Sequence, residues 1–388
     1  MKSKKILAIT GIRSEYDILY PILKEFEKVD FEVCVAVCNA HLSDIHNNTY
    51  QKVIEDGFKI ADKIDCLFST ERLVQRSKGV GLLIMGLSQT IEREQPDFLL
   101  VVGDREESIA TCIAGNYMNI LTIHVGGGDP AYGNTDDPIR FACSKIAHIH
   151  CTTTEQYKQN LIAQGEEEWR ILNSGNPSYV NISHYTKEQD CKCLKELNIM
   201  PQNYIVLLKH PLSSEVGEIA EQMKIAIESC ANFAQEHNLQ VIGIYPNTDP
   251  GSFAIHEQIK LAEQKYLNVR FFKTLPRKTF ITLISNTLAL VGNSSMGILE
   301  APFYKIPVVN IGNRQKGRLN AGNVNFVDYS QEKIISALKQ ACFDKTYRTE
   351  IKNLKNPYGD ETSCKKIVDF VKKIDLKDKK WYIKTKLC

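Results

Sequence analysis

The sequence predicts an α/β protein built from two doubly wound parallel sheets. Short apolar runs alternate with helical stretches in the first half of the chain, and the same pattern restarts in the second half. Alternation of strand, crossover helix and strand is typical of a parallel sheet covered by helices on both faces. The length of 388 residues also favours two domains over one, because a domain averages roughly 150 residues.

The first series of elements fills the N-terminal half of the chain. Buried strands are expected where apolar residues follow one another, at residues 6–10, 31–37, 98–102, 121–125 and 148–152. Helices are expected between them, at residues 16–27, 72–94, 106–119 and 138–147. This series predicts a first domain over residues 1–180.

The second series repeats the alternation. Its strands are expected at residues 204–208, 241–245, 269–272, 289–292 and 308–311, and its helices at 215–235, 253–266, 277–285 and 295–303. A polar segment with two prolines places the domain boundary at about residues 175–200. The second domain is therefore expected over 200–360, followed by a C-terminal helix and tail over 361–388, whose lysine-rich end is expected to be solvated.

Composition excludes several classes of protein. Lysine and arginine number 48 and aspartate and glutamate 46, so the net charge of +2 argues against binding along a nucleic-acid backbone. No apolar run approaches the ~20 residues that span a bilayer, and the basic start lacks a signal-peptide core. The 12 scattered cysteines contain no C-x-x-C pair, so buried free thiols in a cytoplasmic protein are expected, with neither a membrane nor a nucleic acid as partner.

Ligands of doubly wound sheets bind beyond the carboxyl ends of the strands, and two such domains predict a cleft between them. Arg13 follows the first strand at a glycine turn and helix start, which suits a phosphate. A solvent-exposed arginine beside an ordinary helix cap is the alternative. Asp104 follows the strand at 98–102 and suits a base, a sugar-hydroxyl acceptor or a metal ligand, or only caps the next helix.

Three further aspartates follow the strand at 121–125. The glycines at 126–128 precede Asp129, and such a run is expected where the backbone approaches a ligand closely, with a plain loop as the alternative. Asp136 and Asp137 come next, and Asp137 precedes a proline, as a helix N-cap does. Crowded carboxylates serve general acid–base chemistry. No tight His/Asp spacing accompanies them, so no metal is expected.

The second half offers a histidine and a nucleotide-type turn. His210 follows the strand at 204–208, and suits an acid, a base, a phosphate partner or a structural role. Ser294 and Ser295 lie between a strand and a helix, where free N–H groups suit a diphosphate and ordinary capping is the alternative. Glu300 lies further along the same expected helix, where a carboxylate would accept from both hydroxyls of a ribose.

Taken together, these segments resemble those of one family, the hydrolysing UDP-N-acetylglucosamine 2-epimerases that feed sialic-acid-type sugars. The segments follow the order of the family over nearly the whole chain, and the two specific ones are GNSSMGILEAP and IGNRQKGR. The matching segments are GIRSEYD (11–17), GDREES (103–108), HVGGGD (124–129), DDPIRFACSKIAH (136–148), KHP (209–211), GNSSMGILEAP (292–302) and IGNRQKGR (311–318).

The resemblance implies a GT-B-like fold, in which two Rossmann-type domains face each other across a cleft and the C-terminal domain holds most of the nucleotide. It implies that the last helix, at about 364–373, crosses back to the first domain. In the match to the family's catalytic acids, Asp136 is the better match and its neighbour Asp137 is the alternative. By the same resemblance the catalytic residues are Asp104, Asp129, Asp136 and His210, and the UDP contacts are Arg13, Ser294, Ser295, Glu300, Arg314 and Arg318.

The implied reaction eliminates UDP from UDP-N-acetylglucosamine to give a 2-acetamidoglucal, and then adds water to give N-acetylmannosamine. No cofactor or metal is required, and a dimer or tetramer is implied. The non-hydrolysing branch binds a second UDP-sugar through G-Q-H and H-R-R-E-N motifs. This chain has Asn-Ala-His at 39–41 and His-Pro-Leu at 210–212 in their place, which favours the hydrolysing reaction.

Two departures from the family pattern leave the sugar open. Asp129 replaces the usual glutamate, and the loop at 130–135 is longer than the common form. UDP-2,4-diacetamido-2,4,6-trideoxyglucose, on a route to legionaminic acid, is therefore an alternative substrate. A glycosyltransferase of the GT-B fold with a UDP-sugar donor is the alternative of another class, and a nucleotide-sugar-binding regulator is the non-enzymatic one.

Overall fold

The computed structural model describes residues 3–68, 72–130, 136–187, 191–246 and 251–385. The chain divides into two compact units. The first consists of Met1–Pro130, Asp136–Val180 and Tyr358–Cys388, and the second is built mainly from Asn181–Pro357. Helix α7 (Ser178–Lys187) contains the point at which the chain passes from one unit to the other.

The first unit contains a parallel sheet whose seven strands, among the described residues, have the order β3-β2-β1-β4-β5-β6-β7. The central strands are apolar and buried along their whole length because helices cover both faces. The strand order reverses between β1 and β4, which makes that edge the switch point where ligands bind in such sheets. The strands are β1 (Lys4–Thr10), β2 (Phe31–Cys38), β3 (Lys59–Ile64), β4 (Phe98–Val102), β5 (Leu121–Val125), β6 (Ile149–Thr152) and β7 (Ile171–Asn173).

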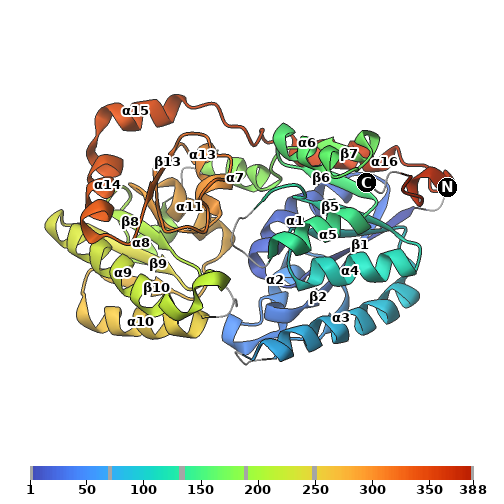
Figure 1. Cartoon of the computed structure of the whole chain (residues 1–388), viewed down its shortest axis with the longest axis horizontal. Coiled ribbons are helices and arrows are strands. Elements are labelled where there is room, and N and C mark those ends of the chain that lie inside the picture. Colours follow the sequence, from blue (N-terminus) through green and yellow to red (C-terminus); the bar gives the residue numbers. More distant parts are fainter. Residues whose placement is uncertain (1–2, 69–71, 131–135, 188–190, 247–250, 386–388) are drawn as a thin grey trace. The chain divides into compact units, whose positions relative to one another are not determined.

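Two layers of helices cover this sheet (Figure 1). One apolar cluster joins the sheet to α1, α2 and α16, and a second cluster joins its other face to α3, α4 and α5. Helix α16 therefore contributes apolar residues to the core of the first unit. The helices are α1 (Arg13–Phe26), α2 (Tyr50–Glu55), α3 (Leu73–Glu94), α4 (Glu106–Tyr117), α5 (Asp136–Ile146), α6 (Glu155–Ala163) and α16 (Ser363–Lys372).

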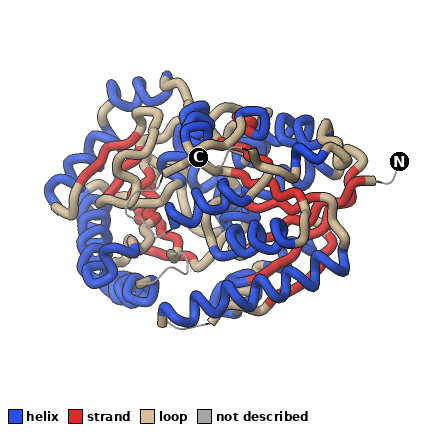
Figure 2. The backbone as a smooth tube through the Cα atoms, turned by 45° about the vertical axis from the view of Figure 1, so that its right-hand side comes forward, coloured by secondary structure: helices blue, strands red, loops and turns tan. Residues whose placement is uncertain are grey.

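The second unit repeats the plan with a parallel sheet of the order β10-β9-β8-β11-β12-β13. Figure 2 shows the strands of each unit enclosed by helices. The strands are β8 (Tyr204–Leu208), β9 (Gln240–Ile244), β10 (Val269–Phe272), β11 (Leu290–Gly292), β12 (Val308–Ile311) and β13 (Val324–Val327). The helices are α8 (Lys192–Glu196), α9 (Ile219–Glu236), α10 (Ser252–Lys265), α11 (Arg277–Ser285), α12 (Met296–Leu299), α13 (Ala301–Tyr304), α14 (Gln331–Phe343) and α15 (Lys345–Asn353).

These sheets confirm the predicted α/β class with two doubly wound domains. Strands β3, β7 and β13 are absent from the prediction because they lie at sheet edges, and their residues are short or mixed runs rather than apolar ones. The single helix expected at 295–303 is divided at Glu300 into α12 and α13.

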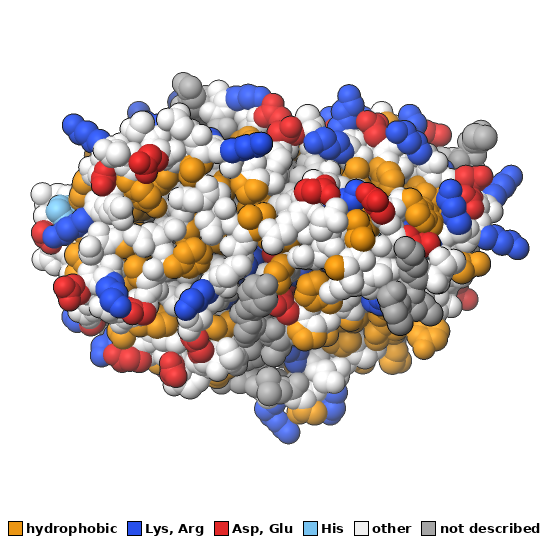
Figure 3. Space-filling model, turned by 45° about the horizontal axis from the view of Figure 1, so that its top comes forward, with side chains coloured by type: hydrophobic (Ala, Val, Ile, Leu, Met, Phe, Trp, Pro, Cys, Tyr) orange, Lys and Arg blue, Asp and Glu red, His pale blue; other side chains and the backbone are white. Residues whose placement is uncertain are grey.

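The helices, the thiols and the charged surface each bear on an expectation drawn from the composition. No helix among the described residues is long and apolar enough to cross a membrane. The eleven cysteines in the described part of the chain are all free, and most are buried. On the face shown in Figure 3, basic and acidic side chains are interspersed.

Candidate active site

Arg140 connects the segments that follow β4 and β5. Its guanidinium donates one hydrogen bond to the carboxylate of Asp104 and another, of 2.8 Å, to the carbonyl oxygen of Gly126. The side chains of Asp104 and Arg140 are 15% and 12% exposed, so the ion pair is largely shielded from water. Asp104 therefore has a fixed orientation at the carboxyl edge of the sheet, where acid–base chemistry on a bound ligand is possible.

His124 supports this edge from inside the protein. Burial lowers the pKa of its imidazole to about 3, so the ring is neutral. Nε2 lies 2.7 Å from the carbonyl oxygen of Gly103, which only accepts, so Nε2 carries the proton. Nδ1 then accepts from the hydroxyl of Ser144 at 3.1 Å. His124 is thus a structural support for Gly103, the residue before Asp104.

Asp129 lies at the end of the glycine run and is 3% exposed. The run itself serves packing within the protein. Gly128 has φ +78°, and a Cβ atom there would lie 2.3 Å from the carbonyl oxygen of Tyr157. The close approach at Gly128 is therefore to the chain's own backbone, and the expected approach of the glycine run to a ligand stays a prediction.

The remaining candidates of the first unit lie at helix starts. Arg13 begins α1, with its Nε 3.5 Å from Oδ2 of Asp17. Asp136 begins α5, and its side chain lies outside the described part of the structure. Helix α5 begins at Asp136 rather than Pro138, so Asp137 lies in the first turn instead of at the expected cap.

A buried pair of glutamates at the same edge is absent from the sequence-based prediction. Glu15 and Glu107 are 7% and 1% exposed, and the charge of Glu107 acts on the carboxyl group of Glu15. The backbone N–H of Gly11 donates to Glu15 at 3.2 Å, and the amide of Asn39 donates to Glu107 at 2.7 Å. Burial, followed by the charge of Glu107, raises the pKa of Glu15 well above its ordinary value. Burial therefore favours the protonated, neutral form of the Glu15 carboxyl group.

The sequence contains a signal for this pair. The segments after β1 and β4 have the same spacing, G-x-R-x-E, at residues 11–15 and 103–107. Because β1 and β4 are neighbours at the switch point, equal spacing brings the two glutamates together. Comparing the two strand ends with each other, instead of separately, would have found them.

Glu15→Gln should change how stability depends on pH. The folded-state pKa of Glu15 is raised, so its contribution to stability is complete below the unfolded pKa and is lost as pH rises toward the folded value. Between these two pKa values, the contribution of Glu15 to the free energy of unfolding falls by ~1.4 kcal/mol per pH unit. We expect the variant to lack this part of the slope and to gain relative stability as pH rises, as measured by urea unfolding at several pH values.

Glu27→Gln is the matched control, because Glu27 follows the same helix in an exposed ion pair with Lys24. Its unfolding should have the pH slope of the wild type. Equal slopes for Glu15→Gln and the wild type would contradict a raised pKa of Glu15 in the folded protein.

In the second unit, Asn293 joins the ends of β8 and β11. Its Oδ1 accepts from the backbone N–H of His210 at 2.7 Å, and its Nδ2 donates to the carbonyl oxygen of the same residue at 2.9 Å. Gly292 has φ +122°, and a Cβ there would lie 2.1 Å from the carbonyl oxygen of Leu208. The backbone of His210 is thereby locked against the turn that precedes α12.

Two arginines of the segment after β12 are tied to the same turn. Arg314 donates to the carbonyl oxygen of Asn293 at 3.2 Å, and Gln315 donates to the same oxygen at 3.0 Å. Arg318 donates to Oε1 of Gln315 at 2.6 Å and is 5% exposed. The structure thus gathers His210, Arg314 and Arg318 around Asn293.

The serines and Glu300 lie along the segment after β11. The hydroxyl oxygen of Ser294 accepts a hydrogen bond from the backbone N–H of Met296 at 3.3 Å. The carbonyl oxygen of Ser295 accepts one from the backbone N–H of Ile298 at 3.0 Å. Glu300 occupies the break between α12 and α13. The N-cap residue of α12 is Ser295, whose side chain makes no capping hydrogen bond, so ordinary capping does not account for this turn.

Lys209 is a further residue absent from the prediction. Its side chain is 2% exposed, and its ammonium donates to the hydroxyl of Tyr329 at 3.0 Å and to Gln222 at 3.4 Å. Burial lowers its pKa to about 8. A buried cation beside His210 adds positive potential at this edge, which suits an anionic ligand.

The described residues contain no group of three or more histidine, cysteine, aspartate or glutamate side chains arranged to hold a metal ion.

Polar residues gather at the carboxyl edge of each sheet. Those of the first unit offer acid–base groups, and those of the second unit offer anion-binding groups.

Comparison with known proteins finds relatives that match this chain over most of its length. A family model described as UDP-N-acetylglucosamine 2-epimerase matches residues 24–372. The UDP-N,N'-diacetylbacillosamine 2-epimerase (hydrolyzing) of Legionella pneumophila is 33% identical over 380 residues, covering 96% of this chain and 97% of that protein. The GDP/UDP-N,N'-diacetylbacillosamine 2-epimerase (hydrolyzing) of Campylobacter jejuni is 30% identical over 345 residues, covering 87% and 88%.

Solved structures share the fold. The crystal structure of UDP-GlcNAc 2-epimerase from Neisseria meningitidis bound to UDP-GlcNAc matches with a TM-score of 0.81 and 20% identity, covering 95% of this chain and 100% of that one. This likeness supports the predicted fold class over nearly the full length of the chain.

Proposed function

Because the chain belongs to the UDP-N-acetylglucosamine 2-epimerase family, we propose that it is a hydrolysing 2-epimerase of a UDP-linked 2-acetamido sugar. The observation that carries the proposal is the bridge made by Arg140, which fixes Asp104 and the backbone that leads to Asp129 at one sheet edge. The products are UDP and the free sugar with inverted configuration at C2.

The two units have different roles in this proposal. Asp104, Asp129 and Asp136 of the first unit supply the acid and base groups. His210 and Arg13 meet the negative charge that develops on the leaving diphosphate. The other UDP contacts are Ser294, Ser295, Glu300, Arg314 and Arg318. The Asn293 network supports this role, because it holds His210 and both arginines in fixed places before a ligand binds.

The chemistry proceeds in two balanced steps. A carboxylate removes the proton from C2, the electron pair forms the C1=C2 double bond, and the C1–O bond to UDP breaks. Water then adds across the double bond, so that hydroxide goes to C1 and a proton from a carboxyl group goes to the opposite face of C2. The net reaction consumes one water, and no redox change occurs.

In deuterium oxide, the free sugar should carry deuterium at C2. The proton removed in the first step exchanges with solvent, and a solvent deuteron is returned in the second. Proton NMR of the reaction measures the loss of the C2 signal together with the release of UDP. Retention of protium at C2 would contradict the elimination and hydration steps.

The preferred sugar is proposed from the relatives. The relative at 33% identity and one at 30% have diacetylbacillosamine in their names, whereas another at 30% is named UDP-N-acetylglucosamine 2-epimerase. Diacetylbacillosamine is 2,4-diacetamido-2,4,6-trideoxyglucose, and the more similar relative carries its name. We therefore expect turnover of its UDP derivative, on a route to legionaminic acid, to exceed turnover of UDP-N-acetylglucosamine, on a route to sialic acid. Parallel kcat/KM measurements decide between the two substrates.

The same assays separate the rival reactions. A glycosyltransferase would release UDP only when an acceptor is added. A non-hydrolysing epimerase would yield an epimer that is still linked to UDP.

A further inference from the structure

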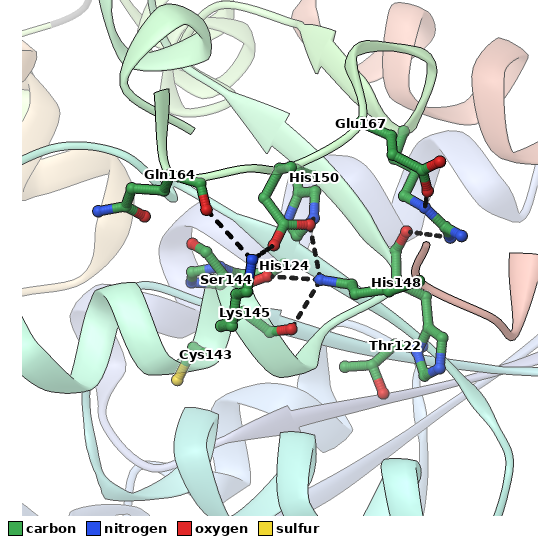
Figure 4. Close-up of polar contacts among 12 residues, drawn as sticks. Thr122, His124, Cys143, Ser144, Lys145, His148, His150, Gln164 and Glu167 are labelled. Carbon is green, nitrogen blue, oxygen red and sulfur yellow. Dashed lines mark hydrogen bonds and ion pairs between the residues drawn. The ribbon is translucent and has the colours of Figure 1, made fainter. Parts of the chain in front are cut away.

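The C-terminal segment places a buried ammonium at the end of α5. The side chain of Lys384 is 13% exposed. Its Nζ donates to the carbonyl oxygens of Ser144 and Lys145 at 3.0 and 2.7 Å, and to the carboxylate of Glu166 at 2.6 Å. This corrects the expectation of a solvated lysine-rich terminus for Lys384. Figure 4 shows the polar contacts around Ser144 and Lys145.

The acceptors of Lys384 identify its role. Helix α5 ends at Ile146, so the carbonyl groups of Ser144 and Lys145 belong to its last turn. Such carbonyls have no partner within their own helix, and a cation is favourable there because the C-terminus of a helix carries partial negative charge. Lys384 caps α5 from a position about 240 residues further along the chain.

A second buried cation holds the tail in place. Arg170 is fully buried and donates to the carbonyl oxygens of Lys380, Trp381 and Ile383. It also pairs with Glu167 at 2.8 Å. These hydrogen bonds hold the segment that directly precedes Lys384 against the first unit.

Helix α5 connects this cap to the candidate chemistry. The hydroxyl of Ser144 bonds to His124, and His124 holds the carbonyl oxygen of Gly103 before Asp104. Arg140, one turn before Ser144, pairs with Asp104 directly. The cap and the candidate carboxylate are therefore connected by two routes through the same helix.

We propose that Lys384 is a positioning residue for the acid–base edge of the first unit, acting through α5 on Arg140 and Asp104. The catalytic part of this inference rests on the proposed function. The placement of α5 by Lys384 does not.

The test compares Lys384→Met with Lys380→Met, which removes an exposed ammonium from the same tail. Lys384→Met should lower kcat roughly 10- to 100-fold, as expected for a small misplacement of reacting groups. The Kd for UDP should stay within about twofold of the wild-type value, since the proposed UDP contacts lie mostly in the second unit. Lys384→Arg should recover most of kcat, and Lys380→Met should behave as the wild type.

A double-mutant cycle separates positioning from a general loss of folded protein. With Arg140→Gln already present, Lys384→Met should have little further effect on kcat, because both substitutions act on Asp104 through α5. Effects that multiply independently, or a wild-type kcat in Lys384→Met, would overturn the catalytic part.

Hydrogen exchange tests the structural part without a substrate. Amides of residues 137–147 should lose protection in Lys384→Met and retain it in Lys380→Met. Unchanged protection in both variants would overturn the inference even if the enzyme is active. The two proposals can fail separately. If the wild-type protein turns over no UDP-sugar, the proposed function has failed. If Lys384→Met nevertheless loses amide protection in α5, the placement of α5 by Lys384 stands.

Discussion

Asp104→Asn is expected to reduce kcat by about 10²- to 10⁴-fold, the range typical of a lost acid–base group. The amide neither takes nor returns a proton, and it leaves the guanidinium of Arg140 without its carboxylate partner. Binding of UDP should persist, because the proposed diphosphate contacts lie largely in the other unit. Continuous measurement of UDP release gives kcat, and calorimetric titration gives the Kd for UDP.

Asp97→Asn provides the control from the opposite end of the same strand. Asp97 precedes β4 and accepts the backbone N–H of Lys5 at 2.7 Å, so its loss weakens the fold locally without touching the carboxyl edge. We expect its kcat to remain within about twofold of the wild-type value. Wild-type kcat in Asp104→Asn would show that the wrong carboxylate has been assigned.

Arg170→Met is expected to have the largest effect on stability. It removes a buried cation together with its hydrogen bonds to Oε2 of Glu167 and to several backbone carbonyl groups. Loss of one partner from a buried charged network costs about 3–5 kcal/mol. Both tryptophans of the chain, Trp169 and Trp381, lie at this contact with ring centroids 4.8 Å apart. Urea unfolding followed by tryptophan fluorescence therefore reports directly on the tail.

Arg93→Met is the matched control within the same unit. Arg93 is 52% exposed and pairs with Asp62 at 2.9 Å. Its loss should change the free energy of unfolding far less than the loss of Arg170, because water and salt screen an exposed ion pair. A similarly small effect of Arg170→Met would mean that the tail is held mainly by its apolar contacts.

The fold could be predicted from local patterns because most strands of both sheets are buried on two faces. Runs such as those of β4 and β5 are apolar at every position, and helices separate them at regular intervals. Edge strand β3 has the sequence KIADKI, in which no such pattern exists. Prediction therefore fails at the edge strands β3, β7 and β13, whereas the edge strand β10 is predicted at its observed residues.

The candidate site was predictable only where chemistry follows a strand directly. Asp104, Asp129 and His210 occupy such positions, and reasoning from strand ends finds each of them. Glu15 and Glu107 depend on the pairing of β1 with β4, and Lys384 depends on the return of the chain to α5. These partners are distant in sequence, so no single segment reveals them, and the two glutamates emerge only when the G-x-R-x-E segments at 11–15 and 103–107 are compared.

The return of the C-terminal segment to the first unit also determines when that unit is complete during synthesis. Its apolar core includes Ile367, Val371 and Trp381, which leave the ribosome only after the whole of Asn181–Pro357 has been translated. At roughly 5–20 residues per second this interval lasts roughly 10–40 s. The nascent chain must keep an unfinished hydrophobic surface from aggregating throughout that time, so the N-terminal half is the part of the polypeptide that most needs a chaperone.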